Sequence, residues 1–355
     1  MMNRDLKISV VVVTYNGREY LPDCFNSLKR QTFLPNQIIV IDNASKDGSI
    51  KYLEKVFPEV DLIINKKNVF FAPANNQGIE IAFQNQADYI FLLNQDTVLE
   101  NNCLEKLAQV AEEQKSNNIF AWQPLILCWP KKDLIQTAGD KMHFLGFGFC
   151  GDYKKPVSHF LKNLIDPYPR LTYGSGAGLF IKADILKKIG FFDKDLFLYH
   201  EDLDLCLRAR MMGYQIKLNS QACLYHKYTE GIPKYRWYWS ERNRLLTLIK
   251  FYKLPTLILI FPAWLFMEFG VLAFSLVTGW FHLKIKSYIS FFIELPRTLN
   301  KRMKIQRKRK ITDKELAKSL EERFDFVGFT HPLIKNIVNP VLGFYWRWVK
   351  KIIFW

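Results

Sequence analysis

The apolar residues of the first hundred positions follow two alternating patterns. Short runs without polar interruption are typical of strands that are covered on both faces. These runs lie at residues 8–13, 37–41, 62–65 and 89–93. The segments between them have apolar residues at helical spacing, over residues 20–32, 50–56 and 76–84. Strands that alternate with helices predict an α/β fold built on a doubly wound, mostly parallel sheet.

The pattern becomes irregular over residues 122–170, where Gly, Pro and aromatic residues are frequent, and no elements are predicted there. Regular spacing returns with an apolar strand at residues 179–181 and a short helix that ends near residue 189. A further helix is predicted from about Glu201 to Gly213, a residue type that suits a helix C-cap.

Polar residues directly follow three of the predicted strands. They are Thr14 to Gly17, Asp42 to Asp47 and Asn94 to Asp96. Ligands of doubly wound sheets bind beyond the carboxyl ends of the strands, so these segments are the expected site. Neither G-x-G-x-x-G after the first strand nor G-x-x-x-x-G-K-[ST] occurs, which removes the main support for a dinucleotide or P-loop site. Taken alone, Asp42 to Asp47 is typical of a helix N-cap cluster.

Several motifs occur in a fixed order along the chain. They are TYN (14–16), DNAS (42–45), N-x-x-F-A-x-A-N-N-x-G (68–78), NQD (94–96), HED-DLCLR (200–208) and a late His226. This ordered set resembles the family 2 inverting glycosyltransferases of GT-A fold, and most of all their bacterial rhamnosyltransferase-type members. The resemblance covers about residues 7–250, and several motifs in order are much more specific than any one alone.

The resemblance implies a donor and an acceptor. The expected partners are a dTDP- or UDP-sugar, with rhamnose as the suggested sugar, and a lipid-linked or cell-surface glycan. The donor nucleotide is expected at Thr14, Tyr15, Asn16, Asp42, Asn68, Asn94 and Asp96. Asp42 matches the residue that accepts the ring N–H of a pyrimidine. Gly174, Ser175 and Gly176 are expected to shape the acceptor and sugar side, where glycines permit close backbone approach.

The resemblance also implies a cation and a base. Mn²⁺ or Mg²⁺ would neutralise the leaving diphosphate, and hard cations choose oxygen ligands. Asp96 and His226 match the metal ligands, and because Asn94 replaces the first Asp of the usual D-x-D, the cation would rest mainly on Asp96. Asp202 matches the general base, with Glu201 beside it. Without the other motifs, these two acids would only indicate a favourable helix dipole.

Charge is distributed unevenly along the 355 residues. Residues 1–232 hold 27 Lys+Arg against 26 Asp+Glu, whereas residues 233–355 hold 23 against 8. We therefore expect a transferase domain at 1–232 and a basic, helical, membrane-associating region at 233–355. The alternative is a nucleic-acid-binding protein that uses the basic region on phosphates and carries an inactive α/β domain. That alternative predicts binding to duplexes that depends steeply on salt.

The basic region contains an apolar stretch at residues 254–283 that is long enough to cross a bilayer, which needs about 20 residues. Lys and Arg flank both of its ends, and Pro255, Pro262 and Gly270 are expected to interrupt the helix. A re-entrant or interfacial helix pair is therefore favoured over a span. The block KRMKIQRKRK at 301–310 would attract an anionic leaflet.

Two further features bear on location. Six widely spaced cysteines without a C-x-x-C pair indicate a reducing cytosol. The first apolar run, six residues long, is shorter than a signal-peptide core. The expected place is the cytoplasmic face of the bacterial cell membrane, with peripheral or monotopic attachment and no nucleic-acid partner.

Overall fold

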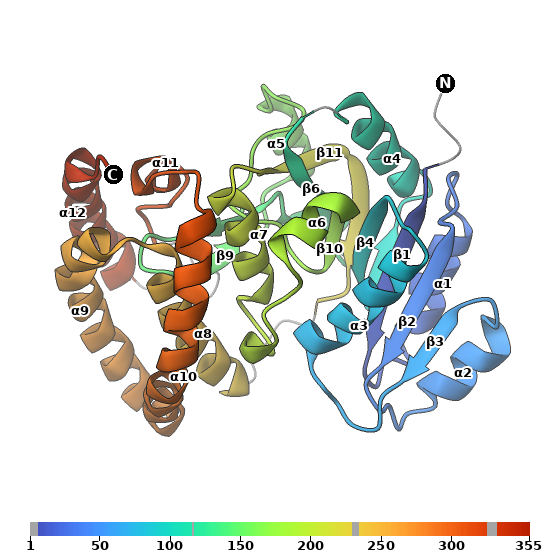
Figure 1. Cartoon of the computed structure of the whole chain (residues 1–355), viewed down its shortest axis with the longest axis horizontal. Helices are drawn as coiled ribbons and strands as arrows, with labels where there is room; N and C mark the ends of the chain where they lie inside the picture. The colour runs from blue at the N-terminus through green and yellow to red at the C-terminus, as the bar shows by residue number, and fades with distance from the viewer. Residues whose placement is uncertain (1–5, 116, 229–233, 325–331) are drawn as a thin grey trace.

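The computed structural model describes residues 6–115, 117–228, 234–324 and 332–355. Figure 1 shows a central sheet flanked by helices, with the helices of the C-terminal third gathered at one side of the molecule. The predicted α/β class is confirmed.

The first half of the sheet is parallel, as predicted. It comprises β1 (Ile8–Thr14), α1 (Leu21–Lys29), β2 (Gln37–Asp42), α2 (Ser49–Val56), β3 (Asp61–Ile64), α3 (Phe71–Gln84) and β4 (Tyr89–Asn94). The strands lie in the order β3-β2-β1-β4. α3 begins at Phe71, earlier than predicted. Pro73 is compatible with this start because it lies in the first turn, and the buried amide of Asn75 interrupts the apolar spacing on which the prediction was based.

The second half of the sheet is mixed. The elements of this part of the chain are β5 (Thr97–Leu99), α4 (Cys103–Glu113), β6 (Ile119–Cys128), β7 (Ile135–Thr137), β8 (Asp140–Met142), β9 (Gly148–Cys150), α5 (Val157–Lys162), β10 (Gly178–Lys182), α6 (Ala183–Ile189), the short 3-10 helix η1 (Lys194–Leu196), α7 (Glu201–Met211) and β11 (Gln215–His226). β8 and β9 pair only with each other, as a separate two-stranded sheet, and β7 pairs with β6. β10 runs antiparallel between β4 and β6, and β11 is parallel to β6. The sheet order is therefore β3-β2-β1-β4-β10-β6-β11-β5.

Strand β6 lies in the region where the sequence predicted no elements. Pro124 in its middle cannot donate to a strand ladder, which conceals the strand in the sequence. Pro124 lies opposite Asn219, and β11 shifts register between Asn219 and Cys223. This irregularity accommodates the proline inside a buried strand.

Helices cover both faces of the sheet. In β1, Val11 belongs to the core that includes α3 and α7, whereas Val10 and Val12 belong to the core that includes α1 and α4. Coverage on both sides is the reason that the parallel strands are apolar throughout.

The C-terminal third is helical, as predicted. It contains α8 (Lys234–Phe251), α9 (Leu254–Val277), α10 (Phe281–Lys308), α11 (Asp313–Ala317), the π-helical turn η2 (Ile334–Val338) and α12 (Asn339–Ile352). The expectation that Pro255, Pro262 and Gly270 interrupt the apolar helix is wrong, because α9 is one helix of 24 residues. Pro255 occupies the first turn, where N–H groups lack helical partners. Among the described residues, α9 is the one helix whose length and composition would allow it to cross a membrane.

The C-terminal helices pack directly on the sheet domain. One core cluster combines residues of α3 and α7 with Leu248, Ile260 and Trp346 from α8, α9 and α12. The predicted boundary between residues 232 and 233 lies outside the described residues and stays a prediction.

Part of the basic block at 301–310 faces the protein interior. Lys301 contacts Asp193 and Asp195 in the loop before α7, and Arg309 contacts Asp313. Arg302 also faces inward and contacts the carbonyl oxygens of Ile249 and Tyr252. The remaining four cations of this block are exposed: Lys304, Arg307, Lys308 and Lys310. The block is therefore only partly available to a membrane.

Candidate active site

Loops from neighbouring strands meet at the carboxyl ends of β1, β2 and β4. Thr14 lies opposite Asp42 in the register of β1 and β2, and β4, which also pairs with β1, ends at Asn94. Gln95 joins these loops, because its Oε1 accepts from the Thr14 hydroxyl at 2.6 Å and from the Tyr15 N–H at 3.0 Å. Gln95 was not among the residues predicted for the site, although its place inside the NQD motif was a signal for it.

One carboxylate oxygen of Asp42 has no hydrogen-bond partner among the described residues. The residue is fully buried, and its Oδ1 accepts from the Ser45 N–H at 2.8 Å. Its Oδ2 is buried without a hydrogen-bond partner among the described residues. A buried acceptor without a donor is costly, so a ligand N–H at this oxygen would be stabilising.

Asn16 and Asn68 shape the two loops beside Asp42. Asn16 Oδ1 accepts from the Lys46 N–H at 2.9 Å, which ties the loop after β1 to the loop after β2. Asn68 Oδ1 accepts from the Phe70 N–H at 2.8 Å, and Phe70 has a positive φ of 68°. The Phe70 ring packs at 5.9 Å from that of Trp239 in α8. Both asparagines therefore use their side-chain oxygens to hold the backbone.

Asp96 and His226 form a pair at the ends of β4 and β11. His226 Nε2 lies 3.1 Å from Asp96 Oδ1 and 3.5 Å from Asn94 Nδ2. On the other side of the ring, Nδ1 lies 2.9 Å from Gln136 Oε1. Burial raises the pKa of Asp96, but the charge and hydrogen bond of His226 lower it more, so that it stays below its ordinary value.

This pair fits one divalent cation. When His226 is neutral and its Nδ1–H donates to Gln136, Nε2 and the Asp96 carboxylate face each other as two electron-pair donors, and a cation can satisfy both in place of the proton that charges His226. Two neighbouring ligands of an octahedral ion lie about 3 Å apart when each bond is about 2.1 Å, and the observed separation is 3.1 Å. No group of three or more His, Cys, Asp or Glu suited to a metal occurs in the part of the chain that the structure describes. The remaining ligands would come from a diphosphate and water.

Asp202 lies in the first turn of α7, where two N–H groups stabilise its carboxylate. Gly176 donates to Oδ2 at 3.1 Å, and Leu203 donates to Oδ1 at 2.7 Å. Burial nevertheless raises the pKa of Asp202 above its ordinary value, because these hydrogen bonds offset desolvation only in part. An ionisable carboxyl with a raised pKa in a site is suited to accept a proton.

The segment Gly174 to Gly176 connects Asp202 to the sheet. Gly174 N–H points to Cys206 Sγ of α7 at 3.4 Å, and Ser175 N–H donates to Gln123 Oε1 of β6 at 2.7 Å. A Cβ on Gly176 would lie 3.0 Å from the Phe71 ring, so the glycine permits a close approach there.

Glu201 has a different environment from that of its neighbour. It is buried, and its Oε2 has no partner among the described residues. Burial raises the pKa of Glu201 well above its ordinary value, and the negative charge of Asp202 raises it further. The surroundings therefore favour the protonated form of Glu201, whereas two N–H groups favour the ionised form of Asp202.

A strained turn precedes these two acids. Phe197, Tyr199 and His200 have positive φ angles of 57°, 63° and 68°, a conformation that L-residues adopt at a cost of about 1–2 kcal/mol each. Asn243 of α8 holds this turn, because its Nδ2 lies 2.8, 3.0 and 2.7 Å from the carbonyl oxygens of Leu196, Leu198 and Tyr199.

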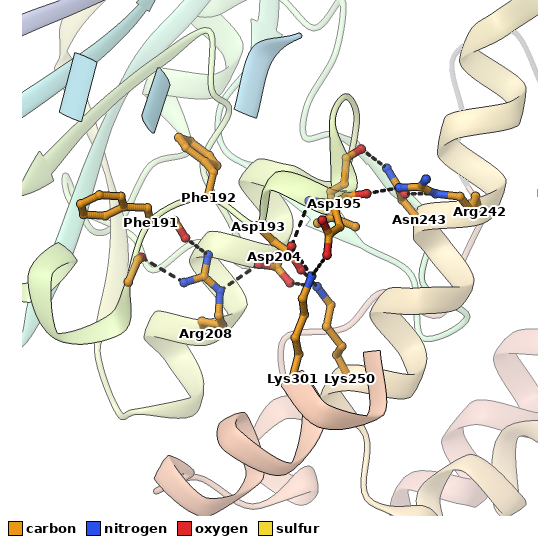
Figure 2. Close-up of polar contacts among 12 residues, drawn as sticks. Phe191, Phe192, Asp193, Asp195, Asp204, Arg208, Arg242, Asn243, Lys250 and Lys301 are labelled. Carbon is orange, nitrogen blue, oxygen red and sulfur yellow. Dashed lines mark hydrogen bonds and ion pairs between the residues drawn. The ribbon is translucent and has the colours of Figure 1, made fainter. Parts of the chain in front are cut away.

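Ion pairs connect the same region to the C-terminal helices. Figure 2 shows Asn243 and Arg242 of α8 directed toward the loop before α7, with Lys250 and Lys301 converging on its carboxylates. Lys250 lies 2.9 Å from Asp193 and also contacts Asp204 of α7. This network was not predictable from the sequence, because its partners lie far apart in the chain and share no motif.

Backbone contacts place the Asp96–His226 pair and Asp202 at one edge of the sheet. Asn94 N–H donates to Ala177 O at 3.1 Å, and the preceding residue, Gly176, donates to Asp202. The predicted residues are therefore brought together, whereas their roles stay predictions.

The charge of Asp202 also affects a residue that was not predicted for the site. Burial and then this charge raise the pKa of Asp140, on β8, to about 8.

Known proteins resemble this chain in sequence and structure. A family model described as Glycosyl transferase family 2 matches residues 9–190. The uncharacterized glycosyltransferase YwdF of Bacillus subtilis (strain 168) is 27% identical over 60% of this chain and 70% of its own length. The dTDP-rhamnosyl transferase RfbF of Shigella flexneri is 23% identical over 68% of this chain and 80% of its own length.

The structural comparison concerns the fold. The crystal structure of GalNAc-T7 with UDP, GalNAc and Mn²⁺ aligns with a TM-score of 0.56 and 17% identity, over 69% of this chain and 48% of that one. At this identity the likeness is one of fold.

Proposed function

The chain belongs to glycosyl transferase family 2 and has the GT-A fold, and we propose that it transfers a sugar with inversion from a nucleoside diphosphate to a glycan hydroxyl. The observation that carries this proposal is the shared sheet edge that holds Asp42, the Asp96–His226 pair and Asp202. These groups match three needs of the reaction. Asp42 would bind the nucleobase, the Asp96–His226 pair would hold the cation that neutralises the diphosphate, and Asp202 would accept the proton.

The proposed step is a single displacement. Asp202 accepts the proton of the acceptor hydroxyl while the oxygen forms its bond to the anomeric carbon. The bond from that carbon to the diphosphate breaks, and the diphosphate leaves with the electron pair, so the configuration is inverted. Mn²⁺ or Mg²⁺ held by Asp96 and His226 would act as a Lewis acid that neutralises the leaving group.

The proposed donor is a pyrimidine nucleotide. The free Oδ2 of Asp42 suits the ring N–H that uracil and thymine share. The similarity to the dTDP-rhamnosyl transferase RfbF supports dTDP-rhamnose as the donor. A lipid-linked glycan is the proposed acceptor, which would place the enzyme at the cytoplasmic face of the membrane.

A donor panel tests this function. The full chain would be incubated with UDP- and dTDP-sugars and glycan acceptors, with Mn²⁺, with Mg²⁺ or with a chelator. We expect release of dTDP from dTDP-rhamnose, loss of release with the chelator, and a product of inverted configuration by NMR. Release of UDP alone would refute the thymidine donor, and a product of retained configuration would refute the single displacement.

A further inference from the structure

Helix α9 has the reverse of the usual pattern of a surface helix, which buries apolar residues and exposes polar ones. Its polar residues, Thr256, Glu268 and Ser275, are at most 3% exposed. Within α9, all of which the structure describes, every exposed residue is apolar. The large ones are Leu254, Ile258, Phe261, Leu265, Phe266, Phe269, Leu276 and Val277, which are 40–88% exposed. We call these eight residues the α9 outer face.

Inward contacts fix the rotation of α9. Glu268 contacts Arg244 of α8, and Lys284 of α10 lies 2.8 Å from its Oε2. Thr256 Oγ1 accepts from the Trp355 indole N–H at 2.9 Å. Removing one partner from such a buried ion pair is strongly destabilising. The helix therefore cannot turn its polar residues outward, and the outer face stays apolar.

We infer that the α9 outer face binds the surface of an anionic lipid bilayer, with the helix lying in the plane of the membrane. The exposed charge of the C-terminal helices favours lipid over a second copy of the chain. Exposed cations lie on α10, on the segment after it and on α12: Lys286, Lys304, Arg307, Lys308, Lys310, Arg347 and Lys351. Two copies that associated through these helices would bring like charges together, whereas anionic headgroups attract such cations.

The contacts of α9 also favour an in-plane position over a crossing. At one end the Tyr345 hydroxyl donates to Leu259 O, and at the other the Phe274 ring lies 6.0 Å from that of Trp237. The helix is thus attached to the folded body along its length, at the edge of the molecule opposite α2 (Figure 1). A crossing would carry the attached helix α10 into hydrocarbon, with its exposed Lys286 and Arg297, which is unfavourable for charged side chains.

Vesicle flotation of the full chain tests the surface. We expect binding to vesicles of phosphatidylcholine mixed with phosphatidylglycerol, and weaker binding to phosphatidylcholine alone. The double variant Phe261→Glu, Phe269→Glu should bind at least about tenfold more weakly. The matched control is Leu34→Glu, Ile165→Glu, which changes two exposed apolar residues elsewhere (61% and 99% exposed) and should bind as the parent does.

A depth measurement tests the orientation and does not depend on the double variant. A fluorescent amino acid would be placed singly at residues 258, 265 and 276 and quenched by lipids that carry a quencher at known depth. Equal, shallow depth at all three positions supports the inference, whereas a deep centre with shallow ends would show a crossing helix and overturn it.

Two other outcomes would also overturn the inference. They are unchanged flotation of a folded double variant, and a lipid-free dimer that this variant dissociates. The inference deepens the proposed membrane location and is independent of the reaction. Because flotation measures no turnover, its failure would leave the proposed transfer intact.

Discussion

At the scale of single residues, the surroundings of Asp202 and Glu201 differ, and the difference supports Asp202 as the proposed base. Asp202 accepts N–H groups from Gly176 and Leu203, and these bonds favour its ionised form although burial raises its pKa. Glu201 has an oxygen without a partner among the described residues, and burial with the charge of Asp202 raises its pKa well above the ordinary value. The environment thus assigns the ionisable role to one of two adjacent acids.

Substitution of each acid by its amide tests this assignment. Asp202→Asn removes the proton acceptor and should lower kcat by about 10²- to 10⁴-fold. Glu201→Gln is the matched control, because burial favours the protonated form of Glu201 and the amide is its neutral isostere, so most activity should be retained. Nucleotide affinity, measured by calorimetry, should be unchanged in both variants. Near-normal turnover by Asp202→Asn would remove it from the base role.

The pH dependence follows from the same residue. A base must be ionised, so kcat/KM should fall as the pH decreases through the pKa of Asp202. Because burial raises that pKa, the fall should centre above 3.8, the ordinary value for Asp. Rate profiles of the full chain would measure it, and the residual activity of Asp202→Asn should lack this acidic limb. A limb at or below the ordinary value would contradict the burial argument.

At the scale of elements, the turn before α7 depends on a helix from another part of the chain. The sequence predicted α7 and the acids in its first turn, because helix spacing and the HED motif are local signals. It did not predict that Asn243 of α8 holds the carbonyl groups at 196–199. Such contacts carry no periodic signal. Strand β6 was not predicted for a different reason: Pro124 in its middle argues against a strand, and the irregularity of β11 that accommodates this proline lies far away in the sequence.

Removal of the Asn243 amide should change the position of Asp202 while the protein stays folded. In Asn243→Ala the strained residues Phe197, Tyr199 and His200 lose their clamp and can relax, so kcat should fall by about 10- to 100-fold while nucleotide affinity is kept. Thr247→Val, one turn further on α8, is the matched control, because the Thr247 hydroxyl is buried without a partner among the described residues.

A double-variant cycle with Asp202→Asn distinguishes positioning from general damage. If Asn243 acts through Asp202, its substitution should change the residual rate of Asp202→Asn very little. Full additivity of the two effects would mean that Asn243 has only a structural role.

At the scale of the whole molecule, the helices of the basic C-terminal third share a core with the sheet domain. The sequence revealed its charge and its apolar helix, but not that Lys250 and Lys301 pair with acids of the loop before α7 or that Glu268 faces inward. Composition counts charges without showing which are already paired. Packing therefore leaves the α9 outer face, and a reduced set of exposed cations, for an external partner.

The central claim is that one sheet edge holds a nucleoside diphosphate together with its cation. Calorimetric titration of dTDP and UDP into the full chain, with Mn²⁺ and with a chelator, tests it most directly, with Asp96→Ala and Asp42→Asn as variants. We predict tight binding only with the cation, loss of the cation effect in Asp96→Ala, and weaker binding of both nucleotides to Asp42→Asn. Equal affinity with and without the cation, unchanged in both variants, would contradict the claim.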